Sequence, residues 1–152
     1  MKILICSDQS NSIPVIISEE ILTMFDNELN IYAACKYPKT FIIPEYLQAL
    51  KNIGMEVNQF KIYDIKALTK ENFDYIINLY CSQENQFPMQ CINTKTTINI
   101  DINLPQISTD SVYANMIGIL KMKEKLIPLI YSFYTKIKSE SYANIELIET
   151  RA

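Results

Sequence analysis

The chain of 152 residues contains no histidine, one arginine and only two glycines. Without histidine, Ser–His and Cys–His nucleophile pairs are excluded, and so are metal sites built on imidazole. The single arginine, Arg151, stands next to the C-terminus. A planar bidentate clamp on phosphate would therefore have to use that residue or be supplied by a partner.

Charge and hydropathy exclude two further classes of function. The formal net charge is −3, and no cluster of Lys and Arg suggests an interface for nucleic acid. The first apolar run, "MKILI", is about five residues long, whereas a membrane span needs about 20. We therefore expect a cytoplasmic protein that binds neither nucleic acid nor membrane.

Four cysteines are present, at positions 6, 35, 81 and 91. They lack the close pair spacing of a zinc site, and in a reducing compartment we expect them to be thiols. No metal and no cofactor is expected.

Hydrophobic periodicity predicts four strands and three helices. The strands are expected at 2–6, 29–35, 75–81 and 94–102, and the helices at 13–27, 43–54 and 108–138. Residues 63–73 are interpreted as a connector. Pro128 is expected to kink or divide the last helix.

This order of elements predicts an α/β domain, a three-layer sandwich whose four-stranded, mostly parallel sheet carries helices on both faces. The domain is expected to cover residues 1–138, followed by a C-terminal tail, 139–152. In such sheets ligands bind beyond the carboxyl ends of the strands. Cys6 and Cys81 both end apolar strands, so they could share one crevice.

Ten tyrosines allow two interpretations. Among them are Tyr32, Tyr37, Tyr63, Tyr131 and Tyr134. An exposed cluster of such side chains would form a surface for a partner, whereas buried ones would line the seams between helices and sheet.

The loop after the first strand, "CSDQSNSIP" (6–14), suggests a family. The chain resembles the low-molecular-weight protein tyrosine phosphatases and the thioredoxin-coupled arsenate reductases built on the same fold. That family opens with a strand and Cys-Thr-Gly-Asn-Ser-Cys-Arg-Ser, followed by Pro-Met-Ala-Glu. Here Cys6, Ser10 and Pro14 are in register, "KNIGME" (51–56) is similar to its "KEIGID", and "FDYIINLYC" (73–81) to its "FDYVITLC".

The resemblance implies that Cys6 occupies the position of the thiolate nucleophile. The family's loop arginine, which grips the oxyanion and lowers the pKa of the thiol, is replaced by Ser12. Asp8 stands in place of the loop glycine, and Gln9 in place of the bracing asparagine. The position of the hydroxyl that hydrogen-bonds the thiolate holds an isoleucine. The residues expected to contact any ligand are Ser7, Asp8, Gln9, Ser10, Asn11 and Ser12.

The family's second catalytic group is also replaced. Phosphatases of this type use an aspartate just before a proline as the general acid. Alignment on Pro105 places Leu104 there, and Asp101 lies four residues before the proline. The resemblance therefore implies a chain that is inactive as a tyrosine phosphatase.

The main hypothesis is a pseudo-enzyme of this family with a binding or regulatory role. A protein partner and a small anion at the Cys6 loop are the expected ligands, and a homo-oligomer stays open. One alternative is a thiol redox protein, or an arsenate reductase-like enzyme, that uses Cys6 and Cys81, with Cys91 as a further relay thiol. Another is a phosphocysteine carrier, because "CSDQSNS" also resembles the loop of cysteine-phosphorylated sugar-transport components.

Overall fold

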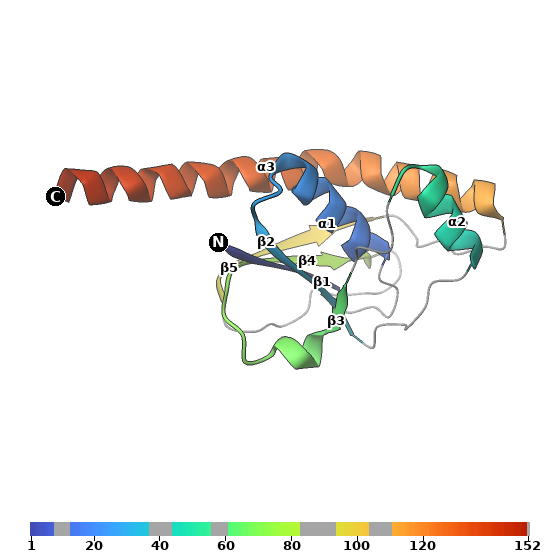
Figure 1. The fold of residues 1–152 in the computed structure, drawn as a ribbon, viewed down its shortest axis with the longest axis horizontal. Helices are drawn as coiled ribbons and strands as arrows, with labels where there is room; N and C mark the ends of the chain where they lie inside the picture. Colours follow the sequence, from blue (N-terminus) through green and yellow to red (C-terminus); the bar gives the residue numbers. More distant parts are fainter. Residues whose placement is uncertain (8–12, 37–43, 56–60, 83–93, 104–110, 152) are drawn as a thin grey trace.

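The computed structural model describes residues 1–7, 13–36, 44–55, 61–82, 94–103 and 111–151. Strands and helices alternate along most of this chain (Figure 1). In order, the elements are β1 (Lys2–Ser7), α1 (Ile13–Phe25), β2 (Asn30–Cys35), α2 (Pro44–Asn52), β3 (Ile62–Asp64), the 3-10 helix η2 (Ile65–Leu68), β4 (Phe73–Tyr80), β5 (Thr94–Asp101) and α3 (Val112–Arg151).

The sheet has five strands, in the order β3-β2-β1-β4-β5, and every strand pairing is parallel. The α/β architecture is confirmed, but the predicted number of four strands is wrong. The additional strand, β3, has three residues and pairs with the end of β2, with Ala33 opposite Ile62 and Cys35 opposite Asp64. Such a short edge strand carries too little periodicity to be separated from a connector.

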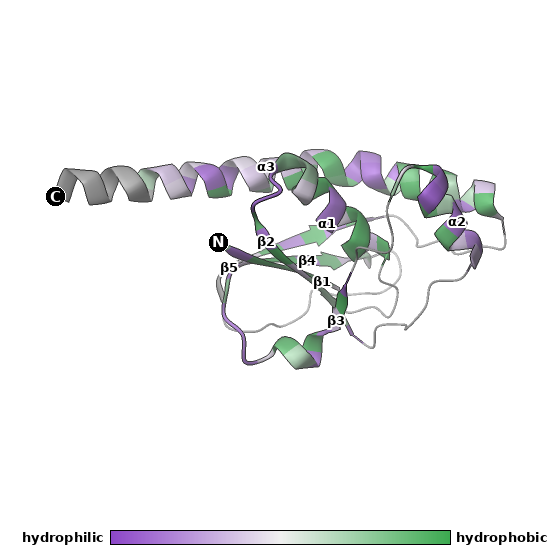
Figure 2. Cartoon of the chain, in the orientation of Figure 1, coloured by the Kyte–Doolittle hydropathy of each residue, from purple (hydrophilic) through white to green (hydrophobic). Residues whose placement is uncertain are grey.

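The central strand is β1, "KILICS". Its run of apolar residues (Figure 2) has no polar alternation because both of its faces are covered, as in most parallel sheets. It pairs with β2 on one side and β4 on the other, and Cys6 lies between Ala34 and Asn78. Along the chain, strands are therefore added to the sheet first on the β2 side of β1 and then on its β4 side.

Three α-helices cover one face of this sheet (Figure 1). Buried side chains of α1, α2 and α3 pack there with Ile3, Ile5, Ile77 and Leu79 of the central strands in one continuous cluster. Right-handed crossovers explain why α1 and α2 share a face: β1, β2 and β3 succeed one another in the same direction.

The opposite face carries a smaller cluster, formed around Leu4, Cys6 and Ile76. In the described part of the chain, the helical cover here is η2, whose Leu68 belongs to this cluster. Asp64 begins η2 as its N-cap, because its carboxylate accepts a hydrogen bond from the backbone N–H of Lys66 at 3.0 Å. Helical segments thus lie on both faces, as predicted, but with very unequal coverage.

The last helix, α3, is longer than predicted and is not divided at Pro128. It is one helix of 40 residues, and its backbone continues through 139–151, the segment expected to be a tail. Pro128 lies on the exposed side, where water can solvate the carbonyl that loses its helical partner, and Leu126 and Ile130 anchor the helix on both sides of it. The division into domain and tail stays a prediction.

Figure 1 shows that the C-terminal part of α3 extends past the side of the sheet where β1 begins. The phenol of Tyr75 on β4 donates a hydrogen bond to Glu140 of α3 at 2.7 Å. This bond, followed by burial, raises the pKa of Tyr75 to about 12.

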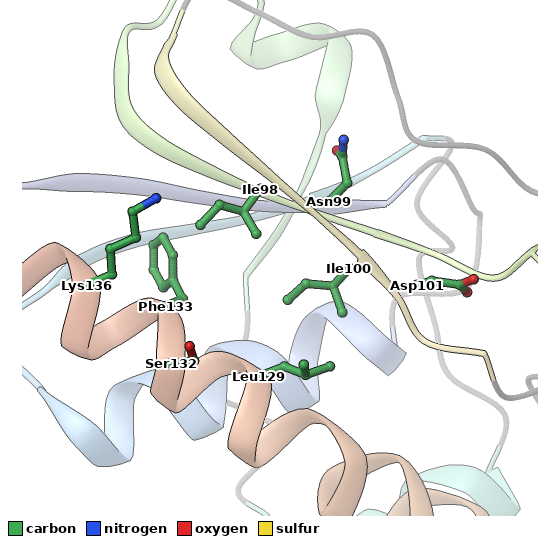
Figure 3. A pocket seen from close by; sticks show the side chains of 8 residues that line it. All are labelled: Ile98, Asn99, Ile100, Asp101, Leu129, Ser132, Phe133 and Lys136. Atoms are coloured by element: carbon green, nitrogen blue, oxygen red, sulfur yellow. The ribbon is translucent and has the colours of Figure 1, made fainter.

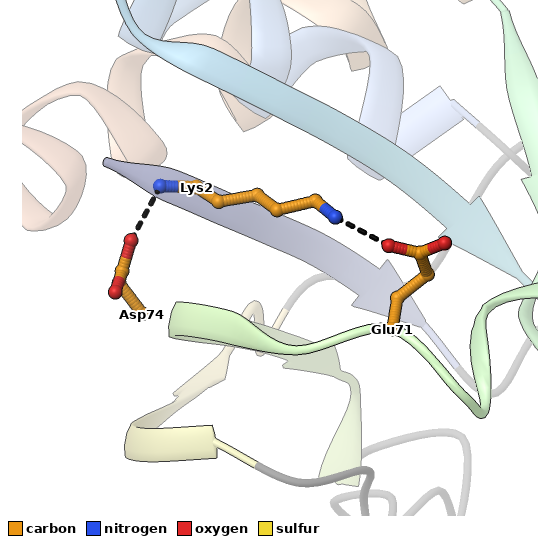
Figure 4. Close-up of polar contacts among 3 residues, drawn as sticks. All are labelled: Lys2, Glu71 and Asp74. Carbon is orange, nitrogen blue, oxygen red and sulfur yellow. Dashed lines mark hydrogen bonds and ion pairs between the residues drawn. The ribbon is translucent and has the colours of Figure 1, made fainter.

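Polar contacts join the amino-terminal ends of β1 and β4 (Figure 4). The backbone N–H of Lys2 donates to Asp74 at 2.7 Å, and the Lys2 ammonium pairs with Glu71. The same ammonium lies 5.0 Å from the ring centre of Tyr32 and 5.1 Å from that of Phe73. These contacts close the end of the sheet that lies away from the Cys6 loop.

Within the ranges that the structure describes, α3 included, no helix has the length and apolar character needed to span a lipid bilayer.

The two glycines make a matched pair for a stability test. Gly54 ends α2 with φ of +88°, and hydrogen bonds from Gly54 N to Lys51 O and from Met55 N to Leu50 O complete a Schellman cap. Gly118 lies within α3, and a Cβ added at either glycine meets no atom within 4 Å. We expect Gly54→Ala to lower the free energy of unfolding by about 1–2 kcal/mol, because alanine is strained at positive φ.

Gly118→Ala should instead raise it by about 0.5–1 kcal/mol, since alanine loses less entropy in a helix. Urea denaturation followed by circular dichroism measures both changes. If both substitutions changed the free energy of unfolding by the same amount, the result would contradict the role of Gly54 as the helix cap.

Glu19 of α1 makes folding dependent on pH. Burial raises the pKa of its carboxyl group from 4.5 to about 7, and its Oε2 atom has no hydrogen-bond partner in the described part of the chain. A raised folded-state pKa favours the folded state below the unfolded value, and this advantage is lost as the pH rises from about 4.5 to about 7. In Glu19→Gln the side chain is neutral at every pH, so this contribution to the pH dependence of stability is removed.

We expect Glu19→Gln to match the wild type in stability near pH 4.5 and to exceed it by about 1–2 kcal/mol at pH 8, a figure reduced for the solvent screening of a partly exposed group. Glu28→Gln, at an exposed carboxylate, is the control. A stability difference that does not change between the two pH values would refute the assignment.

Candidate functional site

The candidate site lies at the carboxyl end of β1. This strand is where the order of the sheet reverses, since the chain builds toward β3 on one side and toward β5 on the other. Loops that diverge at such a point leave a crevice beyond the strand ends. Cys6 and Ser7 are the last two residues of β1 and directly precede residues 8–12.

The Cys6 thiol is completely buried and hydrogen-bonded. It lies among Leu4, Ala34 and Ile76 on the face opposite the three α-helices. Its Sγ atom donates to the side-chain oxygen of Asn78, directly across the strand pair, at 2.8 Å. A carbonyl oxygen can only accept, so in this hydrogen bond the sulfur carries the proton.

Asn78 extends this contact to the next strand. Its side-chain nitrogen donates to the side-chain oxygen of Asn99 on β5 at 3.2 Å, which makes a chain of neutral polar groups across β1, β4 and β5. The sequence analysis missed both asparagines. A signal was present: Asn78 is the polar residue inside the apolar strand "YIINLY", where an unpaired amide would be costly.

Ser7 was expected to contact a ligand, but its side chain is not at the surface. It is buried, and its Oγ atom has no hydrogen-bond partner in the described ranges. Its backbone oxygen accepts from Lys36 N at 3.2 Å, which joins the ends of β1 and β2. The other expected ligand residues, Asp8, Gln9, Ser10, Asn11 and Ser12, lie outside the described residues, as do Leu104 and Cys91.

Cys81 is not brought opposite Cys6. It follows β4 directly, and Cys6 is opposite Asn78, three residues earlier in that strand. Three residues of extended chain correspond to about 10 Å, beyond the Cα separation of about 4.4–6.8 Å that a disulfide allows. Cys6, Cys35 and Cys81 are thiols in the structure.

Cys35, which ends β2, is an inert thiol. Burial, assisted by the nearby Asp64 carboxylate, raises its pKa to about 11. At neutral pH it therefore remains protonated and acts as a small apolar side chain.

Asp101 is the last residue of β5, and its carboxylate accepts hydrogen bonds from residues close to it. Its carboxylate accepts from Ser82 Oγ at 2.5 Å, from Ser82 N at 3.1 Å and from Asn103 N at 3.0 Å. The bond from the Ser82 hydroxyl is the main cause that lowers the pKa of Asp101. A general acid needs a raised pKa, so Asp101 is a structural acceptor and not a proton donor in this arrangement.

A groove of about 340 Å³ lies elsewhere, between β5 and α3. Figure 3 shows Ile98 and Ile100 pointing toward α3, whereas Asn99 points away from it. The groove is therefore on the helix-covered face and Cys6 is on the other, so the two do not form one site. In the described part of the chain, no group of three or more Cys, Asp or Glu side chains is arranged to hold a metal ion.

No protein-family model and no curated protein sequence matches this chain. Solved structures do. An arsenate reductase in its reduced state aligns with a TM-score of 0.63 at 15% identity, over 88% of this chain and 99% of the other. A thioredoxin-dependent arsenate reductase of Corynebacterium glutamicum aligns with a TM-score of 0.59 at 15% identity, over 92% of this chain and 63% of the other.

A low-molecular-weight phosphotyrosine phosphatase of Vibrio cholerae O395 aligns with a TM-score of 0.54 at 12% identity, over 90% of this chain and 98% of the other. The chain has the arsenate reductase and low-molecular-weight phosphatase fold. The expectation drawn from the resemblance is thus confirmed for the fold, and Cys6 lies at the end of the first strand of that fold.

The separation of Cys6 from Cys81 leads to a test by oxidation. We expect no disulfide between these two residues when the folded chain is treated with diamide and mapped by peptide mass. The same treatment in 8 M urea, where the chain is free to bring them together, is the control. A Cys6–Cys81 peptide from the folded protein at a yield comparable with the urea sample would contradict the described geometry.

Proposed function

We propose that this chain is a catalytically degenerate member of the family whose fold it has, retained for binding or regulation and inactive as a phosphatase. The observation that carries the proposal is the Cys6 thiol, which is buried and donates a hydrogen bond to the side-chain oxygen of Asn78. A nucleophilic cysteine needs surroundings that stabilise the thiolate, and an amide oxygen at 2.8 Å does the opposite.

The position of the single arginine supports the proposal. Arg151 ends α3, and a helix of 40 residues is about 60 Å long. Figure 1 shows this end of α3 beyond the amino-terminal side of the sheet, whereas Cys6 is near the carboxyl ends of the strands. The arginine therefore cannot compensate within one chain for Ser12, which stands where the resemblance expects the loop arginine.

The chain also has no acidic side chain at the position expected for the proton donor to a leaving group. At the position that the resemblance assigns to the general acid the chain has Leu104. The nearest carboxylate before it, Asp101, is held ionised by Ser82. A phosphatase that loses both its nucleophile activation and its acid would retain little rate enhancement, since each group contributes several orders of magnitude.

The same thiol weighs against both alternatives. Arsenate reduction and phosphocysteine transfer each begin with attack by a Cys6 thiolate, which the bond to Asn78 disfavours. Arsenate reduction would also need a second thiol within reach, and Cys81 is displaced by three residues in the strand register. Binding of a protein partner or a small anion at the loop needs neither feature.

The test combines turnover with thiol reactivity. We expect the wild type to hydrolyse p-nitrophenyl phosphate, and to reduce arsenate with thioredoxin, no faster than Cys6→Ser. Alkylation of Cys6 by iodoacetamide, resolved by peptide mass, should have a pH midpoint at or above the ordinary value of about 8.5 and no protection by phosphate. Turnover lost in Cys6→Ser, or a midpoint well below 8.5 with phosphate protection, would overturn the proposal.

A further inference from the structure

The helix α3 carries two apolar rows. The row that faces the sheet is buried and consists of Ile119, Met122, Leu126, Ile130, Phe133 and Ile137, with Asn115 at its start. A second row is exposed and consists of Tyr113, Ile117, Leu120, Ile127 and Tyr131. At 100° per residue the two rows are centred about 140° apart around the helix. We call the second row the outer stripe.

The spacing of the outer stripe is that of a coiled-coil seam. Its members follow at intervals of four and three residues, and Glu124 fills the one remaining position between Leu120 and Ile127. Leu120 is 49% exposed and Tyr131 53% exposed. Single exposed apolar residues are ordinary, but five at heptad spacing over about 27 Å form a continuous surface.

The end of α1 marks where this surface stops. Tyr134, the next position of the heptad, stacks on Phe25 with ring centres 5.8 Å apart, and Lys138 pairs with Asp26 at 2.7 Å. Phe25 also meets one edge of Tyr131 at 5.4 Å. At Tyr134 and Lys138 the seam is thus occupied within the chain, whereas the residues of the outer stripe are exposed to solvent.

We propose that the outer stripe is the interface with a second copy of this chain, packed antiparallel around a twofold axis near residue 122. In this register Tyr113 lies opposite the partner's Tyr131, Ile117 opposite the partner's Ile127, and Leu120 opposite the partner's Glu124. Apolar residues thus meet apolar residues in four of six layers, and one stripe serves both partners, as a twofold interface requires.

Charge selects the antiparallel arrangement. Parallel chains in register would place Glu124 against the partner's Glu124, two like charges at the centre of the seam. In the antiparallel arrangement Glu124 lies beside the partner's Lys121, because Lys121 is the neighbour of Leu120, and symmetry makes this pair twice. Both side chains are exposed in the single chain.

The proposal is independent of the chemistry at Cys6. The outer stripe lies on the solvent side of α3, on the helix-covered side of the sheet, and Cys6 belongs to the cluster on the opposite face. Six layers make a small interface, so we expect a dimer that dissociates on dilution through the micromolar range.

Sedimentation velocity of the full chain between about 1 and 200 μM tests the interface. We expect Ile117→Lys and Ile127→Lys each to raise the dimer dissociation constant by at least about tenfold, since a buried lysine in the seam is desolvated. Leu129→Lys is the matched control, because Leu129 is 42% exposed on the same helix but lines the groove with β5. It should change the constant less than about twofold.

Charge reversal tests the register. Glu124→Lys and Lys121→Glu should each weaken the dimer, and the double variant should restore it, because the reversed pair meets again across the axis. Circular dichroism confirms that each variant folds. A monomer at every concentration, a dimer that the stripe variants leave intact, or equal disruption by Leu129→Lys would overturn the proposal, and failure of the double variant to recover would exclude this register.

Discussion

The hydrogen bonding of β1 to strands on both of its sides is the constraint on which the rest of the structure depends. Because β1 pairs with β2 and β4 in parallel, it cannot lie at an edge, and both of its faces must be apolar. Right-handed crossovers then place α1 and α2 on one face. The return from β3 to β4 leaves the opposite face to η2 and its small cluster. The reversal at β1 also puts Cys6 at the switch point of the sheet.

The burial of β1 also shapes the chemistry of its last residues. Cys6 is held in register with Asn78, and the side-chain oxygen of Asn78 accepts a hydrogen bond from the thiol. The fold thus puts a cysteine at the carboxyl end of the central strand, and the neighbouring strand supplies a neutral amide as one of its hydrogen-bond partners. The outer stripe of α3 is separate from Cys6, because α3 packs on one face of the sheet and Cys6 lies on the other.

Much of the fold could be predicted because the patterns were long. The strands "KILIC" and "YIINLY" are continuous apolar runs, and the helices have clear apolar faces, so their positions differ from the structure by only a few residues, except that α3 continues from the expected end at 138 to Arg151. The three-residue β3 was missed because its pairing with β2, not its own pattern, makes it a strand. Pro128 was expected to interrupt α3, but the packed residues on both sides of it hold the helix together. At the site, the identity of Cys6 as the key residue came from the resemblance. Its partner Asn78 is 72 residues away in the chain and could be found only from the strand register.

The sequence by itself determined the class of fold, the place of Cys6 at the end of the first strand, and the absence of histidine and of an internal arginine. These properties are local or compositional, so no folding is needed to establish them. Only the tertiary structure decided that Cys6 donates to Asn78, that Cys81 is out of register with it, and that Arg151 lies at the far end of the molecule. It also separated the two apolar rows of α3 into one that is buried and one that is exposed. Each of these depends on which distant segments lie side by side, and that is set by the pairing of strands and the packing of helices, not by the residues near each site in the chain.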